Sequence, residues 1–185
     1  MKHKIPLKEW ILFSGLGTIM FLSKILMELL PNIHLLGMLT MTYTVVYRKK
    51  TLIPIYIYVF LNGLFSGFSA WWIPYLYIWT VLWGITMLLP KDMKGKTAAV
   101  VYPLICGLHG LAFGTLYAPV QALMFGFSLK MTAAWIVAGL PWDAIHCAGN
   151  LVAGILIFPL TKLLTRLNRS AGINQYPENK KREDI

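Results

Sequence analysis

The sequence predicts an all-α integral membrane protein with six transmembrane helices, an extra outer interfacial segment and both termini on the cytoplasmic side. Of its 185 residues, 57% are hydrophobic and only 13% are charged, whereas a soluble domain carries about 25% charged residues. Residues 51–90 contain no Asp, Glu, Lys, Arg or His. Because about 20 apolar residues cross a bilayer as a helix, this run alone can cross twice.

Six helices are predicted in order over residues 8–30, 33–47, 51–69, 72–89, 97–117 and 141–167. The first follows the basic start of the chain and lacks a small-residue cleavage site, so we expect it to be retained. The second ends before Arg48, Lys49 and Lys50, and the third and fourth come from the charge-free run. The fifth follows a second basic loop. The sixth opens on Pro141, which suits a first helical position.

The segment 118–140 is long enough to span, but it is interrupted by Pro119, Gly126 and Lys130. With six crossings and the N-terminus inside, fifteen of the seventeen Lys and Arg residues are cytoplasmic, as the positive-inside rule requires. These are Lys2, Lys4, Lys8, 48–50, Lys91, Lys94, Lys96 and the basic residues of 162–182. We therefore expect 118–140 to be an outer loop with a helix at the external interface, where Trp135 suits that depth.

The chain is expected to form one membrane domain, residues 1–168, followed by a disordered cytoplasmic tail, 169–185. The net charge of +10 resides in short clusters between apolar runs, which favours topology signals over nucleic-acid binding. Cys106 and Cys147 lie in apolar segments, where a thiol behaves as a small hydrophobe. Two such cysteines do not predict a disulfide framework.

Asp143, His146 and Asn150 fall at i, i+3 and i+7 within the otherwise apolar stretch 131–161. An ionisable side chain in hydrocarbon costs roughly 2.5–3.5 kcal/mol on insertion scales, so such residues usually face a bundle interior or a cavity. One interpretation is that they bind a small polar ligand that enters from outside. The alternative is structural: Asp143 complements the helix dipole, and the other two are packing groups.

Aromatic and amide side chains near the same predicted outer side are further candidates for ligand binding. Trp72, Tyr75 and Trp79 recur at helical spacing, and they either line an outward-facing pocket or belong to the interfacial aromatic belt. Asn62 and Gln121 are amides that can turn inward. His34 and His109 are further polar residues that can turn inward. Lys24 and Glu28 are spaced i, i+4 and can pair on one helix face.

Small residues in the first helix indicate a surface for close helix approach. Ser14 and Thr18 are spaced i, i+4, with Gly15 and Gly17 between them. A helix at the edge of the sequence is the natural one to contact another membrane subunit. We therefore assign these four residues to partner docking.

Motifs for the main catalytic classes are missing from the sequence. Gly95-Lys96-Thr97 resembles the end of a phosphate-binding loop, but the position of its leading glycine is occupied by Pro90. No H-E-x-x-H, no G-x-S-x-G and no Cys/His cluster with metal spacing is present. The sequence thus predicts no enzyme, no catalytic residues, no metal and no cofactor.

Two segments, GFSAWWIPYLYIW (67–79) and GLPWDAIHCAGN (139–150), resemble segments of the S components of energy-coupling factor (ECF) transporters. The likeness extends over nearly the whole chain. It implies a six-helix subunit in the bacterial plasma membrane that captures a vitamin or related micronutrient from outside. It also implies partners, namely a transmembrane coupling subunit and two cytoplasmic ATPases. The family's docking motif in helix 1 is typically Ala-x-x-x-Ala, where this chain has Ser14-x-x-x-Thr18.

The function predicted from the sequence is a substrate-capture subunit of an ECF-type ABC importer that binds a flat heteroaromatic micronutrient. The residues assigned to substrate binding are Trp72, Tyr75, Trp79, Asn62, Gln121, Asp143, His146 and Asn150. Two alternatives stay open at this point. One is an intramembrane enzyme that uses Asp143 and His146 as an acid–base pair, and the other is a ligand-free membrane scaffold.

Overall fold

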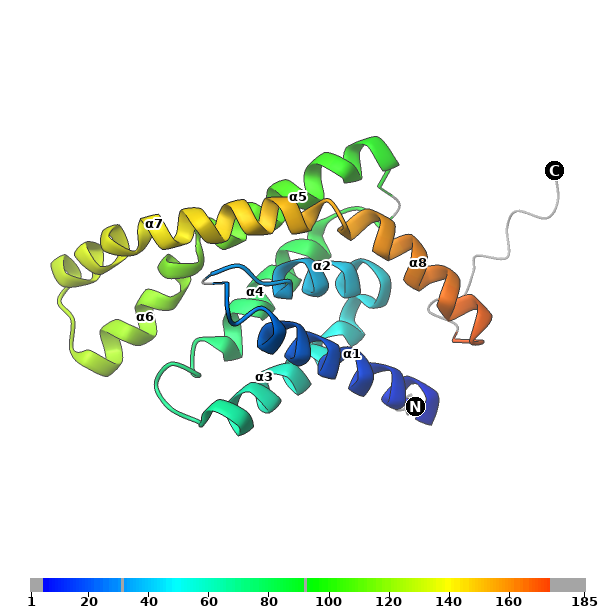
Figure 1. Ribbon diagram of the computed structural model, residues 1–185, viewed down its shortest axis with the longest axis horizontal. Helices are drawn as coiled ribbons and strands as arrows, with labels where there is room; N and C mark the ends of the chain where they lie inside the picture. The colour runs from blue at the N-terminus through cyan, green and yellow to red at the C-terminus, as the bar shows by residue number, and fades with distance from the viewer. Residues whose placement is uncertain (1–4, 31, 92, 174–185) are drawn as a thin grey trace.

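The computed structural model describes residues 5–30, 32–91 and 93–173, and within these ranges the chain is helical, with no strand (Figure 1). The described elements are α1 (Leu7–Leu26), α2 (Leu36–Tyr47), the 3-10 helix η1 (Arg48–Thr51), α3 (Leu52–Ser66), α4 (Tyr75–Leu88), α5 (Gly95–Leu111), α6 (Phe113–Phe125), α7 (Leu129–Gly154) and α8 (Ile157–Ser170). Lys2, Lys4 and most of the predicted tail, 174–185, lie outside the described residues.

Two described stretches are long and apolar enough to cross a membrane, namely α1 and the combined run Gly95–Phe125 of α5 and α6. A third candidate is the pair α7 and α8, if the two helices count as one span despite a bend of 47°. α2 has 12 residues and α3 has 15, so at 1.5 Å per residue each is shorter than the roughly 30 Å hydrocarbon core. Helix lengths therefore establish an all-helical chain with two or three candidate spans.

The first four predicted helices are present; the end of α2 coincides with the prediction, and the other ends differ from it by one to four residues. Most of the residues that were predicted to be helical but are not lie in the connection between α1 and α2 and in the connection between α3 and α4. Gly67 ends α3 with a φ of +87°, a backbone region that glycine enters without steric strain. Asn32, in the connection between α1 and α2, has a φ of +58°.

The prediction of a single helix over 141–167 that opens on Pro141 is wrong. α7 begins twelve residues earlier, at Leu129, where the Ser128 hydroxyl accepts a hydrogen bond of 3.3 Å from the Met131 amide. Pro141 lies inside α7, and its ring removes one backbone hydrogen bond without ending the helix. The helical chain breaks after Gly154 and turns by 47° into α8.

The segment 118–140 is also different from the predicted outer loop. α5 ends at Leu111 and α6 continues the chain to Phe125, so Pro119 is inside a helix. Gly126, with a φ of +67°, caps α6 in the left-handed conformation. The segment is therefore a helical hairpin made of α6 and the start of α7, which extends beyond the rest of the bundle in Figure 1.

Close helix packing depends on glycines at two interfaces. α1 packs on α3 at Gly17, where a Cβ atom would lie 2.7 Å from the Ile57 side chain. α7 packs along α5, where a Cβ atom on Gly154 would lie 2.6 Å from the Cα atom of Pro103. A larger residue at either glycine would push the helices apart.

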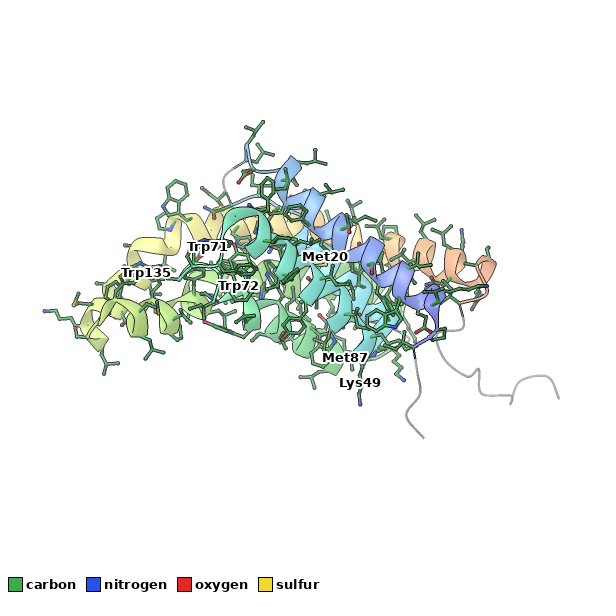
Figure 2. The ribbon with its side chains drawn as sticks, turned by 90° about the horizontal axis from the view of Figure 1, so that it is seen from below. Met20, Lys49, Trp71, Trp72, Met87 and Trp135 are labelled. Atoms are coloured by element: carbon green, nitrogen blue, oxygen red, sulfur yellow. The ribbon has the colours of Figure 1, made fainter. Side chains whose placement is uncertain are left out.

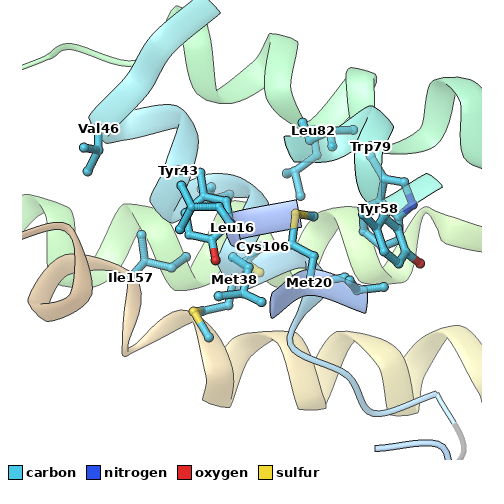
Figure 3. Close-up of a cluster of buried hydrophobic side chains, with 14 of the residues drawn as sticks. Leu16, Met20, Met38, Tyr43, Val46, Tyr58, Trp79, Leu82, Cys106 and Ile157 are labelled. Carbon is cyan, nitrogen blue, oxygen red and sulfur yellow. The ribbon is translucent and has the colours of Figure 1, made fainter. Parts of the chain in front are cut away.

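α2 is the central element of the core, since all its residues except Val45 are buried. It packs against α4, α8, α5 and α7. Figure 3 shows α2 side chains such as Met38 and Tyr43 among residues of α1, α5 and α8. A helix surrounded in this way meets other helices and not solvent or lipid, which explains how an element only 12 residues long is accommodated.

The start of α1, the end of α2 and the start of α5 lie towards the same end of the molecule in Figure 1. We call it the basic end, because Lys8, Arg48, Lys49, Lys50, Lys94 and Lys96 belong to or flank these helix ends. Lys50 pairs with Glu9 of α1 at 2.7 Å. The Arg48 guanidinium donates to the Met87 carbonyl of α4 at 2.6 Å. Figure 2 shows Lys49 and Met87 together at this end, whereas Trp71, Trp72 and Trp135 lie at the other, which we call the aromatic end.

Candidate functional site

Asp143, His146 and Asn150 are buried between α7 and its neighbours, with exposed fractions of 6%, 2% and 1%. The Asn150 side-chain amide donates to the Cys106 carbonyl of α5 at 3.2 Å. The Asp143 carboxylate accepts from the Gly114 amide of α6, at 3.1 Å to Oδ1 and 3.2 Å to Oδ2. The face of α7 that carries these three residues therefore points into the protein, as the sequence predicts.

Asp143 interacts with the N-terminus of a helix, as the structural interpretation of the sequence expected. The helix is α6, however, and not the helix that carries Asp143. Gly114 is the second residue of α6, so the carboxylate satisfies an amide at the N-terminus of α6 and interacts favourably with that helix dipole. A Cβ atom on Gly114 would lie 2.5 Å from Asp143 Oδ2. Glycine is required at this position because the carboxylate approaches the backbone so closely.

Aromatic rings surround Trp79, a fully buried residue of α4. Its ring centroid lies 5.8 to 6.1 Å from those of His34, Tyr58, Tyr75, His109 and Phe113. Figure 3 shows Trp79 and Tyr58 side by side. His146 joins the group through His34, at 4.5 Å between ring centroids, and through Phe113, at 4.8 Å. Five elements and the α1–α2 connection thus converge on one centre.

Polar atoms without partners concentrate at this centre. In the described part of the chain, nine residues have buried side-chain nitrogen or oxygen atoms that make no hydrogen bond, and seven of them belong to this region. Five of the seven make the ring contacts above, and Asn62 and Asn150 lie one helical turn from Tyr58 and His146. We call these seven residues the polar cluster: His34, Tyr58, Asn62, Trp79, His109, His146 and Asn150.

The hydrogen-bonding character of three of these atoms is fixed by their chemistry and neighbours. Trp79 Nε1 can only donate. The Nε2 atom of His109 lies 3.1 Å from the Ile78 carbonyl, so it carries the proton, and Nδ1 of the neutral ring is an acceptor. Asn150 uses its amide nitrogen on the Cys106 carbonyl, which leaves Oδ1 as an acceptor.

A cavity of about 440 Å³, widely open to the surface, lies at the aromatic end next to the polar cluster, although none of the seven cluster residues lines it. It is lined by Asn32, Phe113, Gly114, Tyr117, Trp135, Gly139, Trp142 and Asp143. Phe113 belongs to both regions, since its ring lines the cavity and also packs on Trp79 and His146. The volume falls within the range of about 300–1,000 Å³ typical of small-molecule sites.

A second hollow, of about 480 Å³, lies along α3 and is lined by Leu52, Ile53, Tyr56, Ile57, Phe60 and Leu61. Its lining is apolar apart from Tyr56, whose hydroxyl donates to the Leu76 carbonyl at 3.1 Å. This hollow lacks the converging polar groups that orient a ligand.

The structure brings most, but not all, of the predicted substrate-binding residues together. Trp79, Asn62, His146 and Asn150 are in the polar cluster, Tyr75 packs on Trp79, and Asp143 lines the cavity. Trp72 lies elsewhere: it precedes α4 and donates its indole N–H to the Val59 carbonyl of α3 at 2.8 Å. The helical spacing failed for this residue because α4 begins only at Tyr75.

Gln121 is a second predicted binding residue that the structure places away from the cluster. It is half-buried on α6, eight residues and thus about 12 Å along the helix beyond Phe113. The prediction placed Gln121 in an outer loop from which its amide could turn inward. In the structure it lies in the second half of α6 instead.

Tyr58, Phe113 and Tyr117 belong to the site region but were not selected from the sequence. They are aromatic residues in apolar helices, where no local pattern separates a cavity wall from ordinary core. Tyr58 is one turn before Asn62 on α3, and this spacing to a buried amide is the signal that would have found it.

The predicted docking residues of α1 divide into two groups. Ser14, Gly15 and Thr18 are exposed, and a Cβ atom on Gly15 would meet nothing within 4 Å. Gly17 is buried against α3. Gly17 therefore serves the internal packing of α1 on α3, and the assignment of this residue to partner docking is wrong.

Within residues 5–30, 32–91 and 93–173, no group of three or more His, Cys, Asp or Glu side chains is placed to hold a metal ion. The Lys24 ammonium and the Glu28 carboxylate form the predicted pair, at 3.3 Å. Comparisons with protein-family models, with the sequences of characterised proteins and with solved structures found no match to this chain. Function therefore has to be inferred from the chain's own residues.

Proposed function

We propose that this chain is the membrane-embedded substrate-capture subunit of an ECF-type ABC importer. It binds a flat, vitamin-like micronutrient from outside and delivers it through a transmembrane coupling subunit and two cytoplasmic ATPases. The observation that carries the proposal is the polar cluster, in which Trp79 and six other buried residues of the described chain have polar atoms without hydrogen-bond partners.

The polar cluster favours ligand binding over a purely structural role. Each unpaired buried polar group costs about 1–3 kcal/mol, and native proteins contain only a few such groups. Their concentration beside a cavity of about 440 Å³ is what a site needs when it is completed by a ligand with matching donors and acceptors. The rings of Phe113, Tyr117 and Trp135, which line this cavity, offer flat surfaces for a planar molecule.

The proposed topology has six crossings, both termini in the cytoplasm and the basic end facing the cytoplasm. The positive-inside rule supports this orientation. In this topology, α5 and α6 together form one crossing with an extension, and so do α7 and α8. The short α2 crosses while surrounded by other helices of the protein. The cavity then opens to the outside, where a nutrient arrives.

The exposed face of α1 is the proposed contact for the coupling subunit. Ser14, Gly15 and Thr18 form a stretch of small residues on it, which allows another membrane helix to approach closely. Leu22 and Leu26 continue the same exposed face. Docking through this face leaves the polar cluster free to hold the ligand.

The test is the thermal unfolding midpoint of the purified full chain in detergent, measured against a panel of vitamins and their precursors. A ligand that binds the folded state raises the midpoint in a concentration-dependent way. We expect at least one compound to do so for the native chain, and a His146→Ala variant to lose at least ten-fold in its apparent affinity.

Gln121→Ala is the matched control, because Gln121 lies away from the polar cluster. It should keep both the native midpoint and the native response to the ligand. A panel without any stabilising compound, or an equal response of the native chain and His146→Ala, would contradict the proposed function. Recovery of a chemically altered compound after incubation would indicate an enzyme instead.

A further inference from the structure

We infer that the ligand is an uncharged planar heterocycle whose edge carries at least two N–H or O–H donors beside an acceptor, as in a lactam with a ring amino group. Carboxylates, phosphates and ammonium compounds are excluded as the captured species. This inference rests on the proposed function and deepens it, because it names the class of substrate that the polar cluster accepts.

The absence of charge in the polar cluster is the first argument. Its seven described residues are imidazole, phenol, indole and carboxamide side chains, none of them a Lys, Arg, Asp or Glu. Burial disfavours a charged imidazolium. A buried ligand charge without a counter-charge is very costly, so a phosphate or carboxylate would be poorly held here.

The two charged groups nearest the site do not change this conclusion. Asp143 lines the cavity, and both of its oxygens accept from the Gly114 amide, which offsets part of its negative charge. Lys24 pairs with Glu28, at 3.3 Å between its ammonium nitrogen and a carboxylate oxygen. Neither group is a dedicated counter-ion for a ligand charge.

The pattern of donors and acceptors is the second argument. Trp79 Nε1 needs an acceptor on the ligand, whereas His109 Nδ1 and Asn150 Oδ1 each need a donor. A ring with an N–H next to a carbonyl, and a further amino or N–H group, supplies this combination. A carboxylate supplies only acceptors and an ammonium group only donors.

The rings around the site are the third argument, since they require a flat ligand. Phe113 separates the cavity from the polar cluster and contacts both Trp79 and His146. Tyr117 and Trp135, whose rings are stacked at 6.3 Å, line the same cavity. A planar molecule can stack against the faces of the rings that line the open cavity, whereas a bulky saturated one makes poorer contact with them.

The experiment compares neutral and charged members of matched pairs by calorimetric titration of the purified full chain. The pairs are nicotinamide with nicotinate, uracil with orotate, and pterin with pterin-6-carboxylate, and thiamine is the cationic probe. We expect the neutral member of at least one pair to bind at least ten-fold more tightly than its carboxylate, and more tightly than thiamine.

A carboxylate that binds as tightly as its neutral partner, or tighter binding of thiamine, would overturn this inference and leave the proposed capture function standing. A failure of every probe to bind, together with the absence of any stabilising vitamin in the panel described above, would remove the proposed function and this inference together.

Two variants test the assigned hydrogen bonds. Trp79→Phe keeps an aromatic ring but removes the N–H donor, and Asn150→Leu removes the acceptor. Each should weaken binding of the neutral probe at least ten-fold. Trp10→Phe, at a half-exposed site on α1, is the matched control and should bind like the native chain. Unchanged binding by both Trp79→Phe and Asn150→Leu would overturn the inference.

Discussion

Asn62 and Asn168 are both buried asparagines, but their amides are in opposite situations. In the described chain Asn62 is fully buried with no partner for either amide atom. Asn168 accepts from the Tyr47 hydroxyl at 3.2 Å, and its amide nitrogen lies 3.1 Å from the same oxygen. Replacing a residue that serves ligand binding should therefore change stability differently from replacing a residue that serves the fold.

Replacing Asn62 with Leu should leave the stability of the ligand-free protein unchanged or raise it by about 1–3 kcal/mol, because an unpaired buried amide is removed. The same change should weaken ligand binding at least ten-fold. Asn168→Leu should lower stability by about 1–3 kcal/mol without affecting the ligand. Thermal unfolding in detergent, with and without the ligand found in the panel, measures both effects.

Asp143 provides a second test at this scale. Asp143→Ala removes the only side chain described as bonding the Gly114 amide, so it should lower the free energy of unfolding by about 1–2 kcal/mol, as the loss of a helix cap does. Asp143→Asn keeps an acceptor oxygen and should recover most of that stability. Equal unfolding midpoints for Asp143→Ala and the native chain would contradict the assigned capping role.

At the residue scale, burial was predictable where a polar side chain interrupts an apolar run. Asp143, His146 and Asn150 were expected to face the protein interior, because exposing them to lipid would be costly, and all three are buried; their role in binding stays a prediction. Phe113 and Tyr58 were missed, because an aromatic residue in an apolar helix looks the same whether it lines a site or fills the core. Trp72 was assigned to the site from its helical spacing and from the resemblance to ECF S components, whereas its indole donates to the Val59 carbonyl of α3.

At the scale of elements, α1 carries two glycines with opposite environments. Gly17 contacts α3 closely, whereas Gly15 faces open space. Gly17→Leu should destabilise the protein strongly, because α1 must move away from Ile57 and Pro54. Gly15→Leu should fold with the native unfolding midpoint but reduce co-purification with the proposed coupling subunit.

The two α1 variants separate folding from docking. Thermal unfolding reports on the first and co-purification from the producing cells on the second. A Gly15→Leu variant that unfolds early would show that this face packs within the protein. Native unfolding of Gly17→Leu would contradict the described α1–α3 contact.

The helices themselves were predictable only in part. Apolar runs bounded by charges or glycines located α1 to α4 to within a few residues. The helical hairpin of α6 and α7 was missed because Pro119, Gly126 and Lys130 were all taken as helix breakers. Only Gly126 ends a helix; Pro119 and Pro141 are accommodated inside helices.

At the scale of the whole molecule, the proposed topology predicts which side of the membrane each end faces. Lys49 is exposed at the basic end, and Ser69 is exposed in the connection between α3 and α4. With Cys106 and Cys147 replaced by alanine, Ser69→Cys should react with a membrane-impermeant maleimide added to intact cells. Lys49→Cys should react with the maleimide only after the cells are permeabilised. The reverse pattern would contradict the orientation of the basic end.

The composition and the clustering of basic residues were enough to predict an all-helical, membrane-compatible chain. They did not fix the number of crossings, because α2, α3 and α4, with 12, 15 and 14 residues, are each shorter than a bilayer, and α7 meets α8 at a bend of 47°. Their accommodation depends on packing around α2, a long-range property that no single run of sequence encodes.

The central claim is that the polar cluster exists to hold a small molecule. The most direct measurement is mass spectrometry of compounds released when the purified native chain and a Trp79→Phe, Asn150→Leu double variant are denatured. The account predicts a planar, uncharged micronutrient in near-stoichiometric amount from the native chain and little from the folded variant. No released compound from the native chain, or equal amounts from both, would contradict it.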